Sequence, residues 1–189
     1  MGAGPPEQLA FDLDSIMPPR TDLRELWTPD DIFGAAIKEG VDNLLGFRED
    51  YRVEWKSARY SPKELADYFS MWANTQPHGG IIVIGVENDG TISGCLNVGP
   101  DKISEFEQVG PTQCSDARFD IRRIAATRAN DTPDFLLLIR VFYRIDKLVE
   151  TVRGDAFVRA GKTKRQLREE EKRENTYQQG RNSTRTGTR

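Results

Sequence analysis

The sequence has few of the residues that build metal sites and disulfide frameworks. Its 189 residues include one histidine, His78, and two cysteines, Cys95 and Cys114. A multi-histidine metal site and the H-E-x-x-H helix of zinc proteases are therefore excluded. Two cysteines outside any C-x-x-C pair are typical of reduced, structural thiols in a cytoplasmic protein.

Long apolar runs and nucleotide-binding glycine motifs are also missing. The apolar runs are a few residues long, far short of the roughly 20 residues that span a bilayer, and the N-terminus lacks the basic-then-apolar pattern of a signal peptide. We therefore expect no membrane contact and a cytoplasmic location. Neither G-x-x-x-x-G-K-[ST] nor G-x-G-x-x-G occurs, so nothing supports a nucleotide-hydrolase loop or Rossmann-type cofactor binding.

The chain as a whole has little net charge, but positive charge is concentrated toward its C-terminal end. The net charge is −3, yet residues 162–189 carry nine Lys/Arg and four Asp/Glu, a net of +5, and the remaining 161 residues carry a net of −8. A uniformly basic duplex binder is therefore disfavoured. Any contact with nucleic acid would use a local basic patch or the basic C-terminal end.

The chain divides into three parts by composition and periodicity. We expect an N-terminal arm with short helices over residues 1–44, a central domain over 45–163, and a charged helix with a disordered basic tail over 164–189. Helices are predicted over 21–27, 28–39, 62–74, 101–109 and 164–177, the third opened by a capping box at Ser61–Glu64. Strands are predicted over 52–56, 81–86, 91–95, 119–126, 135–142, 148–152 and 156–159. Strands outnumber helices without alternating with them, which favours an α+β fold.

Three short segments carry residues suited to chemistry. Glu49, Glu54 and Lys56 place two carboxylates beside a lysine, which suits Mg²⁺ or Mn²⁺ but also describes an ordinary charged strand. Residues 72–80 form either a glycine turn that lets backbone reach a ligand or a plain helix end. Residues 157–165 run from a strand into a basic turn, which is either a phosphate grip or a solubilising flank.

Taken in order, these segments resemble one known family. Residues 49–56, EDYRVEWK, resemble the E-S-x-x-x-E-F-K opening of the Schlafen AlbA_2-like domain. Residues 71–75 and 79–90 resemble its A-F-A-N-T and G-G-x-x-x-I-G-V-x-D-x-G centre, and residues 156–161 its closing Y-V-R-x-G. The resemblance extends over residues 45–170. It implies a mixed, mostly antiparallel sheet flanked by helices and a nucleic-acid-binding role, in bacteria often as part of transcriptional regulators.

Animal members of this family cleave transfer and ribosomal RNA with three carboxylates. The resemblance implies corresponding positions in this chain. The first two fall on Glu49 and Glu54, while the third falls on Asn88, between Glu87 and Asp89. Asparagine is a weaker metal ligand than aspartate. If the chain is a nuclease, we therefore expect Glu87 or Asp89 to complete a catalytic set with Glu49, Glu54 and Lys56, and Glu49, Glu54 and Asp89 to hold Mg²⁺ or Mn²⁺.

The leading prediction is a DNA- or RNA-binding module that needs no cofactor. Its expected contact residues are Lys56, Arg59, Asn74, Arg159, Lys162, Lys164 and Arg165. The alternatives are a metal-dependent endoribonuclease and a protein-interaction subunit of a larger complex. A homodimer is a further expected partner, because two such lobes form a clamp in the animal relatives.

Overall fold

The structure is a computed structural model that describes residues 27–41, 44 and 52–176. The elements, in chain order, are α1 (Pro29–Glu39), β1 (Val53–Lys56), α3 (Pro62–Ala73), β2 (Gly80–Ile84), a 3₁₀ turn (Leu96–Val98), α4 (Pro100–Gln113), β3 (Arg118–Thr127), β4 (Pro133–Phe142), β5 (Phe157–Ala160) and β6 (Thr163–Gln166). A last helical stretch covers residues 169–176. The helix predicted over 21–27 lies, apart from Trp27, outside the described residues, and so do Glu49 and the tail predicted after residue 176.

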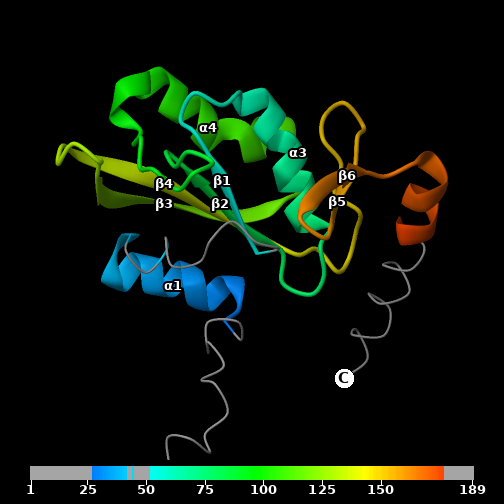
Figure 1. The fold of residues 1–189 in the computed structure, drawn as a ribbon. Coiled ribbons are helices and arrows are strands. Elements are labelled where there is room, and N and C mark those ends of the chain that lie inside the picture. Colours follow the sequence, from blue (N-terminus) through cyan, green and yellow to red (C-terminus); the bar gives the residue numbers. More distant parts are fainter. Residues whose placement is uncertain (1–26, 42–43, 45–51, 177–189) are drawn as a thin grey trace, which may run out of the picture.

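Four strands form one sheet in the order β1-β2-β4-β3. The β1 and β2 strands run parallel, and the other two pairs are antiparallel. Helix α1 covers one face, α3 and α4 cover the other, and the β5–β6 hairpin stands apart beside α3 (Figure 1). This confirms the predicted α+β fold with a mixed, mostly antiparallel sheet.

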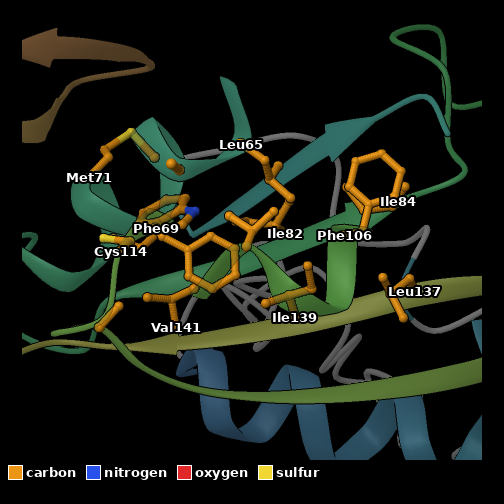
Figure 2. Packing of buried hydrophobic residues seen from close by; sticks show 14 of the residues in the cluster. Leu65, Phe69, Met71, Ile82, Ile84, Phe106, Cys114, Leu137, Ile139 and Val141 are labelled. Atoms are coloured by element: carbon orange, nitrogen blue, oxygen red, sulfur yellow. The ribbon is translucent and has the colours of Figure 1, made fainter. Parts of the chain in front are cut away.

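The sheet separates two hydrophobic cores, because side chains alternate between its faces. In Figure 2, Leu65 and Phe69 of α3 pack over Ile82 of β2 and Ile139 of β4. Trp55 belongs to the second core, beneath α1. All five residues of β2 are buried, as expected of a β-branched run in a central strand.

Helix starts follow the local sequence with one exception. Thr28 caps α1 through a reciprocal pair of hydrogen bonds with Asp31, and Pro29 occupies the first turn. Ser61 precedes α3 but makes no side-chain capping hydrogen bond, so the capping box predicted there is wrong. The pre-set φ of Pro62 and the apolar stripe of α3 are enough to start that helix.

Two predicted strands are absent, and a buried side chain binds part of the backbone of each. Residues 91–95 keep only a single bridge, Val86 to Ile92. Beyond it, the Asp134 carboxylate accepts the N–H groups of Cys95 and Leu96 at 2.9 and 3.0 Å. Residues 148–152 pair with no strand, since the Asn74 side chain occupies both backbone groups of Val149.

The helix predicted from residue 164 starts later than expected. Residues 163–166 form β6 and pair with β5, so the chain folds into a hairpin at Gly161 and Lys162 before the helical stretch at 169 begins. Lys164 and Arg165 are therefore strand residues whose side chains point to opposite faces. This alternation matters for the basic turn, because it separates cations that are adjacent in sequence.

Both thiols are buried and free. Burial raises the pKa of Cys95 to about 11 and that of Cys114 to about 12, so both remain protonated at neutral pH. This agrees with the structural role predicted for them. Among the helices of residues 27–176 that the structure describes, none has the length and apolarity needed to cross a bilayer.

Candidate nucleic-acid interface

Glu54 lies at the centre of the site because of the strand alternation in β1. Glu54 and Lys56 point to the same face of the sheet, toward α3, and Glu54 is 7% exposed. Its Oε1 accepts a hydrogen bond from Lys56 Nζ at 2.6 Å, and its Oε2 accepts one from Arg159 Nη1 at 2.5 Å. One buried carboxylate thus holds a cation of its own strand and one from the distant strand β5, and the trio carries a net charge of +1.

Arg159 fixes the β5–β6 hairpin to the rest of the domain. Its side chain is 4% exposed, and its guanidinium lies 5.0 Å from the ring centre of Trp72 in α3. Its backbone N–H donates to Thr75 Oγ1 at 3.0 Å. A buried guanidinium with a carboxylate and an indole face as partners is well determined in position. The side chain therefore contributes a fixed positive charge rather than a mobile one.

A second group of cations surrounds the Tyr68 ring. Lys56 Nζ lies 4.7 Å from the ring centre and Lys164 Nζ lies 4.6 Å from it. Lys164 also binds Asp67 at 2.7 Å, and Tyr60 packs edge-on against Tyr68 at 6.1 Å. Both lysines already pair with a carboxylate and lie over a ring. They therefore attract an anionic ligand less strongly than unpaired lysines would.

We call the largest basic concavity of the site the basic pocket. It has a volume of about 550 Å³ and four contributing segments: the start of α1, the start of β1, the α3–β2 loop and the β5–β6 turn. Its lining residues are Trp27, Thr28, Pro29, Arg52, Thr75, Gln76, Pro77, His78, Gly79, Arg159, Gly161 and Lys162. Of these described residues none is acidic, and Arg52, Arg159 and Lys162 supply three positive charges.

Arg140 holds two walls of the basic pocket in place. It is 2% exposed in β4, and its Nη2 donates to the carbonyl oxygen of His78 at 2.7 Å. Its Nε donates to Asp30 at the start of α1 at 2.9 Å. On the opposite wall, Arg52 Nη1 donates to the Trp27 carbonyl at 2.8 Å. The pocket is therefore built on hydrogen bonds that exist before any ligand arrives.

Gly79, at the end of the α3–β2 loop, and Gly80, the first residue of β2, allow close packing. Gly80 lies flat against the Trp72 indole, where a Cβ atom would overlap the ring. Gly79 has a φ of +74°, and a Cβ there would meet the backbone of β4. Both positions therefore require glycine for packing, and Gly79 also lines the basic pocket.

We call the concavity on the other side of Lys56 the acidic pocket. It has a volume of about 540 Å³ and is lined by Lys56, Ser57, Tyr60, Glu87, Asn88 and Asp89. The Asp89 carboxylate accepts the backbone N–H of Thr91 at 2.9 Å, which lowers the pKa of Asp89 below its usual range. Burial, and next the neighbouring Tyr68, raises the pKa of Tyr60 well above its ordinary value.

The described residues do not fit a divalent metal ion. Within residues 27–41, 44 and 52–176 no three His, Cys, Asp or Glu side chains are grouped to hold one. Both oxygens of Glu54 already accept hydrogen bonds from cations, which compete with a metal for the same lone pairs. Of the other two expected ligands, Asp89 accepts the Thr91 N–H and Glu49 lies outside the described residues, so we derive no reaction step through a metal.

The structure distributes the predicted contact residues among different roles. Asn74 is buried, and its side chain bonds Val149, Phe157 and Ser70, so it is a structural residue rather than a contact for nucleic acid. Arg165 pairs with Glu171 on the far side of β6. Arg59 is exposed beside α4, where its carbonyl accepts Lys102. Of the predicted set, Arg159 and Lys162 alone line the basic pocket.

Sequence reasoning did not assign Trp27, Arg52 or His78 to the site. Trp27 lies before α1, outside the segment that resembles the family, and His78 lies in a turn without a charge pattern. Arg52 immediately precedes β1 and carried the only available signal, a cation two residues from Glu54. Their convergence depends on the packing of α1 under the sheet, which no local pattern encodes.

Comparison with known proteins identifies the central segment. Residues 49–168 match the family model described as Schlafen, AlbA_2. No curated protein matches the chain. Among solved structures, it is similar to the DIP2311 protein from Corynebacterium diphtheriae, with 19% sequence identity and a TM-score of 0.49. That match covers 79% of this chain and 27% of the other, so the chain corresponds to about a quarter of that protein.

Proposed function

Because the chain belongs to the Schlafen AlbA_2 family, whose domain has a nucleic-acid-binding role, we propose that it is a nucleic-acid-binding module that grips phosphates at the basic pocket. The observation that carries this proposal is the lining of that pocket. Three basic side chains and no acidic one converge there from segments far apart in the chain, among the residues described. A concave surface of one charge sign concentrates the electrostatic field on a phosphate.

Lys162 is the pocket's adjustable cation. It lies exposed at the β5–β6 turn, with no ion pair among the described residues. Arg159 and Arg52 are held by Glu54 and by the Trp27 carbonyl, so they act as a fixed positive background. A flexible lysine at the rim above two fixed guanidinium groups is a reasonable arrangement for backbone phosphates in varying positions.

Fluorescence anisotropy with labelled RNA and DNA at two salt concentrations tests this proposal. Phosphate contacts release counterions, so binding weakens as salt rises, with a slope close to −0.9 per contact for duplex DNA. We expect Lys162→Ala to reduce that slope by about one contact and to lower affinity several-fold at low salt. Lys38→Ala is the matched control, because it removes an exposed lysine at the opposite end of α1.

Two results would contradict the proposal. Salt-independent binding would remove phosphates as the ligand, and equal losses in the Lys162 and Lys38 variants would show that only net charge matters. If no nucleic acid binds, the protein-interaction alternative is the one to pursue, in which the chain serves a larger complex.

The same titration decides the nuclease alternative. The observation in its favour is that Glu87 and Asp89 line a pocket with Lys56. Adding Mn²⁺ or Mg²⁺ to structured RNA, with Glu49→Gln beside the unaltered protein, asks whether cleavage depends on a metal and on that carboxylate. Fragments that vanish in Glu49→Gln would make the chain an endoribonuclease; intact RNA that stays bound leaves it a binding module. Preference for duplex DNA over RNA would favour a regulatory role in transcription.

A further inference from the structure

We propose that the basic pocket receives one unstacked nucleotide, so that the chain prefers single-stranded segments to duplexes. This inference rests on the proposed function and names its substrate class. Its basis is the combination of ring-bearing walls and a cationic rim in one concavity. A phosphate contact uses the cations, and the rings on the same walls suit a base.

Four ring-bearing residues line the same pocket as the cations. Trp27, His78, Pro29 and Pro77 line the same pocket as Lys162. Indole and imidazole rings stack on nucleobases with little dependence on sequence, because every base has a π-face. A nucleotide carries both a base and a phosphate, so it matches the two chemistries that the pocket presents together.

The shape of the pocket disfavours a paired base. Duplex phosphates lie on a convex surface, and paired bases show only their edges in the grooves. A concavity of about 550 Å³ lies within the range of small-molecule sites and takes a single nucleotide, not a helix. A duplex could touch the Lys162 rim but could not place a base against Trp27. Single strands can do both.

Trp27 also supplies a reporter specific to this pocket. The chain has three tryptophans, and Trp55 and Trp72 are 6% and 0% exposed within the cores. Trp27 is half-buried and lines the pocket. A base stacked on its indole should quench its emission, while the two buried indoles stay unchanged.

The experiment is a tryptophan-fluorescence titration of the full chain with a short oligothymidylate and with a blunt duplex that has G·C ends. We expect the single strand to quench emission and to bind about tenfold more tightly than the duplex at equal phosphate concentration, a ratio in line with one stacked base. Trp27→Phe should abolish the quenching and keep most of the affinity. Trp27→Ala should weaken single-strand binding several-fold and leave duplex binding unchanged.

The outcomes separate this inference from the proposed function. Equal affinity for both probes, or quenching that persists in Trp27→Phe, overturns the inference, while a salt-sensitive loss in Lys162→Ala still supports phosphate binding at the pocket. If neither probe binds, both proposals fail. If Trp27→Ala unfolds, Trp27→Phe decides alone, because a phenyl ring preserves the packing of this position on the second core.

Discussion

The two pockets beside Glu54 have nearly the same volume and opposite character. The basic pocket, about 550 Å³, holds three cations and no described acid. The acidic pocket, about 540 Å³, holds one lysine facing Glu87 and Asp89. Glu54 links them, since one of its oxygens binds Lys56 and the other binds Arg159.

The difference teaches that a carboxylate in a family motif is defined by its partners. Glu54 pairs with the ammonium group of Lys56 and neutralises most of its positive charge. Among the described residues, the acidic pocket therefore has no free cation. The basic pocket shares the same carboxylate through Arg159 and also has the exposed Lys162, which has no ion pair among the described residues. In this structure Glu54 orders two cations, Lys56 and Arg159, through its two oxygens.

The largest expected effect comes from removing the residue that the two pockets share. Glu54→Ala leaves the guanidinium of Arg159 and the ammonium of Lys56 without a carboxylate at a site that is mostly buried. Breaking a buried pair by deleting one partner is strongly destabilising, so we expect the free energy of unfolding to fall by about 3 kcal/mol. Chemical denaturation followed by circular dichroism measures the change.

Glu54→Gln is the matched variant for this prediction. The amide oxygen can still accept one hydrogen bond, so the loss should be clearly smaller than for alanine. The prediction fails if Glu54→Ala and the unaltered chain have the same free energy of unfolding within error. Glu54, Lys56 and Arg159 would then not be a structural unit, and the proposed link between the pockets would have no basis.

A charge exchange between the pockets gives a smaller effect and a sharper comparison. Lys162→Asn removes a cation from the basic pocket, and Asn88→Lys adds one to the acidic pocket; both positions are exposed. The double variant has the net charge of the natural chain. We expect it to bind single-stranded nucleic acid several-fold more weakly, like Lys162→Asn alone, because a lysine beside Glu87 and Asp89 is neutralised locally.

Anisotropy titrations at one salt concentration compare the three variants with the natural chain. Restored affinity in the double variant would mean that binding follows the net charge of the chain, and the distinction between the pockets would then have no functional content. Asn88→Lys alone is the internal control for damage to the turn that ends at Gly90.

Much of the fold follows from local patterns, and its errors have long-range causes. The apolar run at 81–84 and the stripe of α3 place both elements correctly, since burial on one or two faces fixes their periodicity. Both missing strands have backbone groups bound by distant side chains: Asp134 accepts the Cys95 N–H from 39 residues away, and Asn74 binds Val149 from 75 residues away.

The sequence predicted only those site residues that lie within a single recognisable motif. Glu54 and Arg159 stand in motifs, and Lys162 follows from its basic turn. Trp27 reaches the pocket because α1 packs beneath the sheet and Arg140 binds both α1 and the His78 carbonyl. Lys164 and Arg165 were expected to act together, but strand pairing sends them to opposite faces.

The smallest effect we predict belongs to the acidic pocket alone and concerns Tyr60. Burial and the neighbouring Tyr68 hold the pKa of Tyr60 well above the ordinary value near 10, so its phenol stays protonated in the folded chain when other tyrosines ionise. A raised pKa in the folded state means that the associated stability is fully present below pH 10 and is lost as pH rises further. Absorbance at alkaline pH should therefore show one of the five tyrosines ionising late in the native chain and together with the rest in denaturant. Tyr60→Phe should remove that late step and no other, whereas a late step that persists in this variant would assign the effect to a tyrosine outside the acidic pocket.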